Sequence, residues 1–599
     1  MQPNTPDLNP QQRAAAEHPT GPLLIAAGAG SGKTHTLMKR IHYLLTISAV
    51  PPEKILAITF TNKAAEEMKR RVKAPSGLFI GTFHSFGARV LRHAARRLGR
   101  TADFTIFDED DSLSLLKSIV KNYNLPKEDY APPAVRALIS HAKNELTSAA
   151  SFTKKTGSMD PETVTALFAD YERSLEKNNA FDFDDLIEKP VRLMQAHPDF
   201  LECMQARYAH ILIDEYQDIN TAQYELVRAL AHTHRNVSVV GDDAQSIYGF
   251  RGADFRNFLN FERDWHHATV VLLEENYRST PTILAAANAI IKNNTLQKQK
   301  NLWTKNPAGS LIRVYAAQDE NDEAEWVVKE ILKLTTSHAV NLEAIALIYR
   351  TNAQSRALEQ TLIAAGIPYR IFGGIRFYDR KEIKDILAAL RLANNPADTV
   401  SAERLRKNFS KGTATLLLRD LPQIGKTKTI ITLIDYFMNT THYIEYLKNN
   451  YQNYEDRLEN IHGLIAFAHS FKDGDLTVFL EQATLAQSHD TPQGRVGVNL
   501  MTIHLSKGLE FNTVFVVGVS EGTLPHHRSY EKLAEMEEER RLMYVAVTRA
   551  EKNVFLSFSN IPSRFLHEID GDLVRFVNTE KKGRGTTLPD QEEMWLEYE

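Results

Sequence analysis

A glycine-rich loop directly behind a short apolar run constrains the fold of this chain more than any other feature. The run PLLIAA at 22–27 has the length of a buried strand, and a helical stretch begins at Lys33. Between them the chain reads AGAGSGKT at 27–34. When a strand, a loop of small residues and a helix follow one another, the N–H groups of the loop and the helix dipole bind phosphate. The sequence therefore predicts an α/β domain with a nucleoside triphosphate site.

The residues of this loop have predicted parts in the site. Lys33 is expected to contact the outer phosphates, and the Thr34 hydroxyl is expected to bind Mg²⁺. The backbone of the small residues would surround the phosphates; these residues are Ala27, Gly28, Ala29, Gly30, Ser31 and Gly32. A glycine-rich turn without a ligand is the alternative interpretation. The strand before the loop and the helix after it favour the phosphate site.

A second apolar run ends in two adjacent carboxylates. Residues 209–213 read AHILI and lead into Asp214 and Glu215. At the end of a strand both side chains can reach a site above the sheet. Asp214 suits a Mg²⁺ ligand, and Glu215 suits the group that positions or deprotonates an attacking water. An isolated pair of this kind would more often be an exposed turn, but downstream of the phosphate loop it predicts hydrolysis.

Two sets of apolar runs alternate with helical stretches. The first set lies at 22–27, 55–60, 78–82, 209–214, 237–241 and 269–274, and the second at 311–316, 344–349, 369–372, 498–503, 513–518 and 553–557. This alternation predicts an α/β fold with two cores, each built on a largely parallel sheet. Each core is interrupted by a helix-rich segment, at about 91–186 in the first and 393–495 in the second.

Composition excludes several classes of protein. The 599 residues contain one cysteine, Cys203, so no intramolecular disulfide or four-cysteine metal site can form. No apolar run approaches the roughly 18 residues of a membrane span, so we expect a soluble, cytoplasmic protein without a membrane partner. The net charge of −4 does not indicate nucleic acid, but residues 68–100 carry nine Lys or Arg and no Asp or Glu. Such a block could neutralise phosphates, although a solvated helix face is the alternative.

Three further loops follow strands of the first predicted sheet and carry aromatic, hydroxyl and basic side chains. These side chains are Phe60, Thr61, Asn62, Thr82, His84, Tyr248, Phe250 and Arg251. Aromatic residues interleaved with arginine bind single strands by base stacking, although one such residue alone more often belongs to a core. Three such loops at one sheet edge favour a nucleic-acid contact.

Two arginines could link hydrolysis to movement. Arg278 follows the last strand of the first core, and Arg549 stands near the end of the second core. An arginine finger stabilises the charge on a transferring γ-phosphoryl group. Fingers on both sides of a cleft would couple its closure to hydrolysis; the alternative for either residue is a surface salt bridge.

The chain resembles the UvrD/Rep/PcrA family of superfamily 1 helicases. The similarity covers about 1–392 and 496–567 and is carried, in the family's order, by LNPQQR (8–13), AGAGSGKT, TFTNKAA (59–65), GTFHSF (81–86), FDFDDL (181–186), ILIDEYQD (211–218), VVGDDAQSIYGFRGA (239–253), LEENYRS (273–279), LIYRTNAQSR (347–356), IFGGIRFYDRKEIKDIL (371–387), VNLMTIHLSKGLEF (498–511), EEERRLMYVAVTRA (537–550) and PSRF (562–565). The resemblance implies two RecA-like cores of the P-loop NTPase type that use ATP and Mg²⁺. It also implies 3′→5′ movement along single-stranded DNA.

The resemblance also implies roles for further residues. Gln12 would read adenine, Tyr277 would stack on it, and Glu510 would approach the ribose. Gln245 would sense the γ-phosphate and, with Lys33, Glu215, Arg278 and Arg549, would form the catalytic set. Thr502 and His504 would contact DNA from the second core.

The resemblance implies a division of the chain into cores and insertions. The expected parts are core 1A (1–90 and 187–275), insertion 1B (91–186), core 2A (276–392 and 496–572), a shortened insertion 2B (393–495) and a flexible tail (573–599). The expected partners are single-stranded DNA and 3′-tailed duplex DNA, bound by a monomer acting in DNA repair or replication.

One departure from the family leaves alternatives open. Only 11 residues, 551–561, separate VTRA from PSRF, where relatives carry a longer β-hairpin that splits base pairs. The leading hypothesis is a DNA-stimulated ATPase and helicase. The second is a translocase that removes bound proteins from single strands with little unwinding. A nucleotide-switched DNA-binding module with little turnover is disfavoured by Glu215, Gln245, Arg278 and Arg549.

Overall fold

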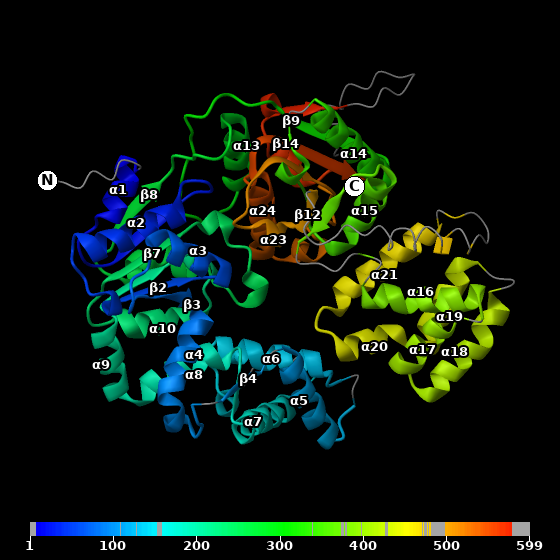
Figure 1. Ribbon diagram of the computed structural model, residues 1–599, viewed down its shortest axis with the longest axis horizontal. Helices are drawn as coiled ribbons and strands as arrows, with labels where there is room; N and C mark the ends of the chain where they lie inside the picture. Colours follow the sequence, from blue (N-terminus) through cyan, green and yellow to red (C-terminus); the bar gives the residue numbers. More distant parts are fainter. Residues whose placement is uncertain are drawn as a thin grey trace.

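The computed structural model describes residues 8–577, apart from 103, 108, 127–128, 153–158, 338–339, 373–376, 378–379, 397, 426–428, 470, 472–475, 477–478 and 481–496. Two parallel sheets form the cores, and two helix-rich units extend from them (Figure 1). The α/β fold with two RecA-like cores is confirmed. The basic tail segment 581–587 lies outside the described residues.

The first core is a six-stranded sheet in the order β3-β2-β6-β7-β1-β8. Its strands are β1 (Leu23–Ala27), β2 (Ile55–Thr59), β3 (Phe79–Thr82), β6 (His210–Ile213), β7 (Val237–Gly241) and β8 (Thr269–Leu273). Its helices are α1 (Pro10–Ala16), α2 (Lys33–Thr46), α3 (Asn62–Val72), α4 (Phe83–Ala94), α8 (Asp185–Ala196), α9 (Pro198–Arg207), α10 (Thr221–Ala231), α11 (Arg256–Leu259) and α12 (Phe261–Asp264). All six predicted strands are present.

Alternation along the strands explains why both faces of this sheet are covered. Leu23, Ile25 and Ala27 pack under α2, while Leu24 and Ala26 pack on the opposite face with residues of α4, α8 and α10. Successive strand residues point to opposite faces, so a wholly apolar strand requires helices on both sides. The covered sheet leaves the carboxyl ends of its strands as the place for a site.

The second core is a seven-stranded parallel sheet in the order β11-β12-β10-β13-β14-β9-β15. Its strands are β9 (Ile312–Ala317), β10 (Ile345–Tyr349), β11 (Tyr369–Ile371), β12 (Val498–Thr502), β13 (Phe511–Val516), β14 (Ala550–Ser559) and β15 (Val574–Phe576). Its helices are α13 (Pro281–Ile291), α14 (Glu320–Thr336), α15 (Ser355–Ala364), α23 (Ile503–Ser506), α24 (Leu533–Val547) and α25 (Arg564–His567). Strand β15, which pairs with β9, lies in the segment predicted as a flexible tail and was not predicted.

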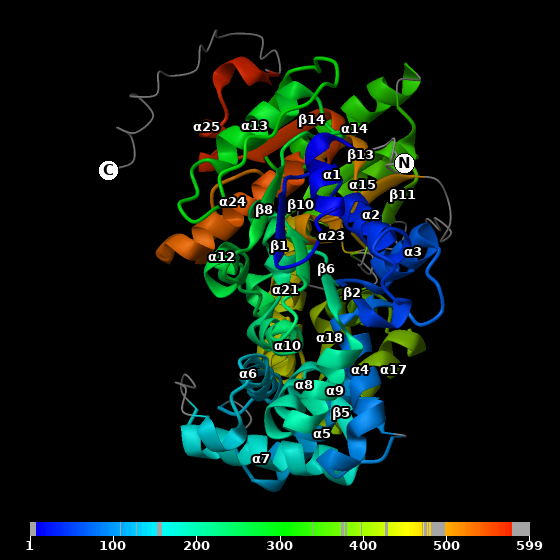
Figure 2. The same ribbon diagram turned by 90° about the vertical axis from the view of Figure 1, so that its left-hand side faces the viewer.

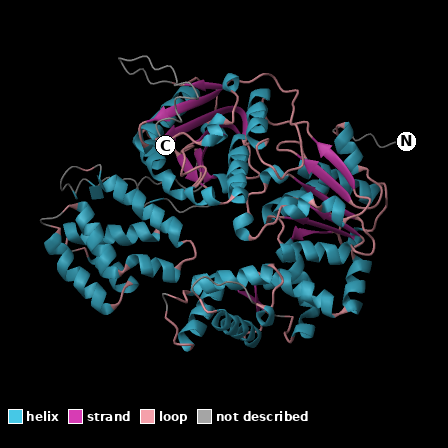
Figure 3. Cartoon of the chain, turned by 180° about the vertical axis from the view of Figure 1, so that it is seen from behind, coloured by secondary structure: helices cyan, strands magenta, loops and turns pink. Residues whose placement is uncertain are grey.

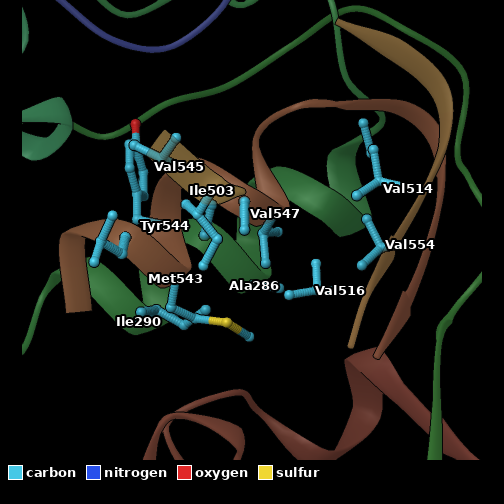
Figure 4. Close-up of a cluster of buried hydrophobic side chains, with 14 of the residues drawn as sticks. Ala286, Ile290, Ile503, Val514, Val516, Met543, Tyr544, Val545, Val547 and Val554 are labelled. Carbon is cyan, nitrogen blue, oxygen red and sulfur yellow. The ribbon is translucent and has the colours of Figure 1, made fainter. Parts of the chain in front are cut away.

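A single apolar cluster joins α24 and α13 to this sheet. Met543 and Val547 of α24 pack with Ile290 of α13 and with Val514 and Val516 of β13 (Figure 4). The same cluster includes Ala29 and Ala244 of the first core. Because buried apolar contact continues across the boundary, α24, which ends two residues before Arg549, packs against both cores in this structure.

Each core has a helical unit inserted in it (Figure 3). The first contains β4 (Thr105–Phe107), α5 (Glu109–Asn122), α6 (Pro132–Asn144), α7 (Pro161–Lys177) and β5 (Ala180–Asp182). The second contains α16 (Lys381–Asn394), α17 (Thr399–Asn408), α18 (Lys411–Ile424), α19 (Ile430–Thr441), α20 (Tyr443–Asn450) and α21 (Tyr454–His469). In a side view the first unit lies at the end of the molecule opposite β14 (Figure 2).

Helix α16 packs inside the second helical unit. Its Ile383, Ile386 and Leu390 share one buried cluster with residues of α18, α19 and α21. The resemblance implies that core 2A runs to 392 and so includes most of α16; this division of the chain stays a prediction, while the buried side chains of α16 pack with helices of the second unit.

Candidate functional site

The glycine-rich loop connects β1 to α2, as predicted. Gly32 caps α2 with φ 81°, and Gly30 has φ 65°, both in the left-handed region that favours glycine. A Cβ atom on Gly30 would lie 2.5 Å from the Asn276 amide nitrogen, which donates to the Ala29 carbonyl at 2.7 Å. The loop therefore depends on glycine both for its backbone conformation and for the close approach of Asn276.

Thr34 and Asp214 meet at the carboxyl edge of the first sheet. The Thr34 hydroxyl donates to the Asp214 carboxylate at 3.1 Å. Hydroxyl and carboxylate oxygens are ligands that Mg²⁺ prefers, so the pair fits the predicted metal site. Burial raises the pKa of Asp214 to about 7, and the neighbouring Glu215 carboxylate adds to this.

Glu215 adopts a left-handed backbone conformation, with φ 52°, that turns its side chain into the site. Burial would raise its pKa, but the positive charges of Lys33 and Lys507 and a hydrogen bond from Gln217 hold the pKa of Glu215 below its ordinary value. The Gln217 amide donates to Glu215 at 2.6 Å. Burial lowers the pKa of Lys33, while the carboxylates of Glu215 and Asp242 oppose that shift.

The residues predicted to bind the base lie on the other side of the loop. Buried Gln12 donates from its amide to the Ser31 carbonyl at 2.9 Å, and it forms a capping box with Asn9 at the start of α1. The Asn9 amide also donates to the Tyr277 hydroxyl at 2.8 Å. The Tyr277 ring is 50% exposed, which leaves its face open to a planar ligand.

The two predicted fingers lie side by side. Arg278 donates to the Thr548 carbonyl at 3.1 Å, and Arg549 donates to the Thr548 hydroxyl at 3.1 Å. Arg278 also forms an ion pair with Glu510, with 2.7 Å between nitrogen and oxygen. Glu510, predicted at the ribose, thus has its carboxylate against Arg278.

Arg549 is almost fully buried and reaches the first core. Its guanidinium lies 3.4 Å from the side-chain oxygen of Gln245. Burial and the charge of Arg278 lower the pKa of Arg549 to about 9. Gln245 donates in turn to Asp242 at 2.6 Å. The loop after β7 and the end of α24 are therefore in direct polar contact.

The same loop continues into an aromatic group three residues after Gln245. The Tyr248 ring stacks on Phe60, with 5.5 Å between ring centroids and an interplanar angle of 10°. Phe250 meets His504 of the second core edge-on at 5.3 Å, and Arg251 lies 5.4 Å above the Phe250 ring. Burial, with the nearby charge of Arg350, lowers the pKa of His504 to about 3, so its ring is uncharged at neutral pH.

Phe60, Tyr248 and Phe250 line one side of a groove of about 1380 Å³. Thr82 and His84, at the start of α4, line it as well, and burial lowers the pKa of His84. Among the described residues predicted to contact DNA, Thr61, Asn62, Thr502 and His504 do not line the groove. Thr61 and Thr502 instead cap α3 and α23 with their hydroxyls, and Asn62 is the first residue of α3.

Several polar residues of the site were missed from the sequence. Lys507, whose side chain is 7% exposed, pairs with Asp218 and donates to the Gln245 carbonyl at 2.5 Å. Lys300 forms ion pairs with Asp242, at 2.9 Å, and with Asp243. Lys507 stands in the quoted string VNLMTIHLSKGLEF, so a basic residue next to a glycine was the available signal; no local pattern points to Lys300.

Two family models match the chain. The UvrD/REP helicase N-terminal domain matches residues 8–266, and the UvrD-like helicase C-terminal domain matches residues 271–457 and 435–561. The chain belongs to the UvrD/Rep/PcrA family. The UvrD-like match extends over both cores and includes the phosphate loop, the aromatic groove and both arginines.

Curated relatives agree with this family. The protein is 41% identical to the ATP-dependent DNA helicase PcrA of Bacillus subtilis (strain 168), over 97% of this chain and 88% of that one. It is 40% identical to the PcrA of Staphylococcus aureus (strain Mu50 / ATCC 700699), over 96% of this chain and 88% of that one. Among the described residues of this UvrD-like chain, no helix is long and apolar enough to cross a bilayer.

Proposed function

We propose that this protein is an ATP-dependent DNA helicase that moves 3′→5′ along single-stranded DNA in DNA repair or replication. The observation that carries the proposal is the loop of 242–251. Within it, Gln245 lies 3.4 Å from Arg549 beside the proposed phosphate site, and Tyr248 stacks on Phe60 in the groove. Because these two residues are three positions apart, a movement of Gln245 on nucleotide binding would be passed directly to the aromatic group.

The phosphate chemistry is assigned to residues of both cores. Lys33 and the loop N–H groups would hold the outer phosphates, and Glu215 would orient the attacking water and accept its proton. Arg278, Arg549 and Gln245 would stabilise the charge that develops on the transferring phosphoryl group. Thr34 and Asp214 would hold Mg²⁺, which when bound offsets the negative charge of the phosphate oxygens.

Base and sugar recognition would come from the edge of the same cleft. Gln12 is held by the Ser31 carbonyl next to the loop, and Tyr277 presents its ring there. Glu510 would reach the ribose when Arg278 turns to the phosphate, since the two side chains now hold each other. When ATP binds, the Arg278–Glu510 ion pair is thus proposed to break, so that Arg278 contacts the phosphate and Glu510 contacts the ribose.

Single-stranded DNA is the proposed track. Phe60, Tyr248 and Phe250 would stack on bases, while Arg251 and the helix start at Thr82 would contact phosphates. His504 faces the same group from the second core. If the cores alternate their hold while ATP opens and closes the cleft, each turnover advances one core along the strand.

Strand displacement tests this proposal. A 3′-tailed duplex is expected to be opened with ATP and Mg²⁺, while a 5′-tailed duplex and a Lys33→Ala variant give no product. ATP turnover is expected to rise when single-stranded DNA is added, and sedimentation is expected to show a monomer. An ATP turnover rate that does not change when DNA is added, together with no strand displacement from either tailed duplex, would contradict the proposal.

The translocase alternative remains one outcome of this test. Residues Ala550–Ser559 form the single strand β14, and PSRF follows at 562. The names of the relatives favour a helicase. Clearance of a protein from a single strand by a chain that opens no duplex would favour the translocase instead.

A further inference from the structure

The groove has a second wall that none of the predicted DNA residues supply. The end of α20 and the start of α21 line it opposite the aromatic group, and we call residues 448–454 the tip. The groove residues within the tip are Lys448, Asn449, Tyr451, Gln452, Asn453 and Tyr454. In Figure 1 this part of the second helical unit is the part that faces α6 of the first.

The tip is supported from both sides. Across the groove, Lys117 of α5 donates to the Asn450 side chain at 3.3 Å, and the Gln452 amide lies 3.5 Å from the Pro133 carbonyl at the start of α6. Behind the tip, Lys381 of α16 donates to the Tyr451 hydroxyl at 2.9 Å. The tip therefore connects the two helical units and covers the groove at this point.

The side chains of the tip suit a nucleotide chain. Lys448 is exposed and lies 5.7 Å from the centre of the Tyr454 ring. Asn449 offers an amide donor and acceptor, and Asn453 offers its amide N–H groups, since its side-chain oxygen accepts from Arg457 at 3.2 Å; base edges and phosphates require such groups. An aromatic ring beside a lysine and two amides is the combination that binds single strands by stacking plus phosphate contact.

Charge argues for a single strand rather than a duplex at this wall. Lys448 is the one basic residue of the tip, and the acidic residues Glu445 and Asp456 line the groove next to it. This wall of the groove therefore has no excess of positive charge. A duplex presents two dense rows of phosphates and needs several cations. Stacking and amide contacts with one positive charge fit one strand whose bases are exposed.

We propose that the tip is a single-strand DNA contact of the second helical unit, in which Tyr454 stacks on a base, Asn449 and Asn453 bind its edges, and Lys448 binds a phosphate. The proposal rests on the proposed function. It adds the second helical unit to the DNA contacts of the groove, so the strand would be enclosed by the first core, the first helical unit and the second.

Binding of a fluorescent oligothymidylate across a salt series tests the tip. Tyr454→Leu keeps an apolar side chain in the partly buried position but removes the ring, and affinity is expected to fall roughly fivefold or more, while Tyr454→Phe stays near wild type. Lys448→Ala is expected to reduce the slope of log affinity against log salt by about 0.7, the value for one lost phosphate contact. Arg406→Ala, an exposed arginine on α17 outside the groove, is the matched charge control.

Three results would overturn the proposal. In the first, the Tyr454→Leu and Lys448→Ala variants bind oligothymidylate with wild-type affinity and salt slope, and the wild-type chain binds DNA and hydrolyses ATP. That result would remove the tip from the DNA path and leave the proposed function intact. The second is loss of affinity for a blunt duplex alone, which would place duplex DNA at the tip. The third is a wild-type chain that binds no single strand, which would contradict the proposed function as well. ATP turnover without DNA and the melting temperature should match wild type in all four variants.

Discussion

The two cores share a sheet architecture but differ at the position proposed to bind phosphate. Strand β1 lies between β7 and β8 and runs into the glycine loop and Lys33; strand β9 lies in the same place between β14 and β15 and runs into α14. Helix α14 is capped by Asp319 and carries Glu320, Asp322 and Glu323 in its first turn. Carboxylates occupy the helix N-terminus where an anion would otherwise bind.

This difference teaches that the parallel sheet supplies a helix start, while the loop decides its chemistry. In the first core, the backbone of a loop of small residues is proposed to bind phosphates. In the second, the Asp319 carboxylate accepts from the backbone N–H groups of Asn321 and Asp322, at 2.8 and 2.9 Å. The second core is proposed to contribute instead through Arg549, two residues after α24, and Lys507, after β12. One nucleotide site would thus be assembled from two unequal cores.

The largest effect is expected when the second core's contribution is removed. Arg549→Ala should lower DNA-stimulated ATP turnover by about 10³–10⁵-fold, because the finger stabilises the transition state. Steady-state phosphate release measures it, with Arg575→Ala, exposed on β15, as the control. Turnover within a few-fold of wild type would show that the first core hydrolyses ATP alone.

Removing the first core's lysine should have a large effect of a different kind. Lys33→Ala is expected to lower turnover by roughly 10²–10³-fold, because one charged donor to the phosphates is lost. Affinity for oligothymidylate without nucleotide should stay unchanged, since Lys33 lies outside the groove. Lys329→Ala on α14, the helix that corresponds to α2, is the control. A variant that keeps its turnover would contradict the role of the loop.

A moderate effect is expected when an aromatic residue proposed to stack on DNA is replaced. Phe60→Leu keeps an apolar side chain but removes the ring that stacks on Tyr248, and it should cost about 1–3 kcal/mol of single-strand affinity. Fluorescence anisotropy measures the affinity, and ATP turnover without DNA reports that the nucleotide site is intact. Equal affinity of Phe60→Leu and wild type would remove the aromatic group from the DNA path.

The smallest effect is expected at the acidic turn of the second core. The double variant Asp319→Asn and Glu320→Gln should change ATP turnover by less than about twofold, because asparagine also caps a helix and no phosphate binds there. Isothermal titration with a slowly hydrolysed ATP analogue should give one site per chain in the variant, as in wild type. Two nucleotides bound per wild-type chain would mean that both cores bind nucleotide, which contradicts the comparison.

The sequence predicted the sheets and the phosphate loop because their signals are local. Each strand is a continuous apolar run, and the loop from Ala27 to Thr34 is read from adjacent residues. It predicted β15 poorly, since Val574–Phe576 is a strand only through its pairing with β9. The amphipathic pattern of α16 likewise does not say which cluster the helix joins; its buried residues lie in one cluster with residues of α18, α19 and α21.

The polar contacts between distant segments were the least predictable part of the site. The Asn276 amide lies beside Ala29, and Lys507 reaches Asp218, although 247 and 289 residues separate the partners along the chain. Thr61 and Thr502, which are predicted to contact DNA, cap helices with their hydroxyls, as Thr82 of the groove also does; the DNA contacts of Thr61 and Thr502 stay predictions, because a hydroxyl before a helix serves either purpose. Spacing alone does not distinguish the two roles.

The distance between the cores in each nucleotide state tests the shared site most directly. Cys203 is exposed on α9 of the first core and is the one cysteine of the chain, so Glu325→Cys on α14 adds a partner for a pair of fluorescent labels. On single-stranded DNA, a slowly hydrolysed ATP analogue is expected to shorten the distance, and ADP is expected to restore it. The same distance with no nucleotide, with the analogue and with ADP would contradict a cleft that closes on ATP.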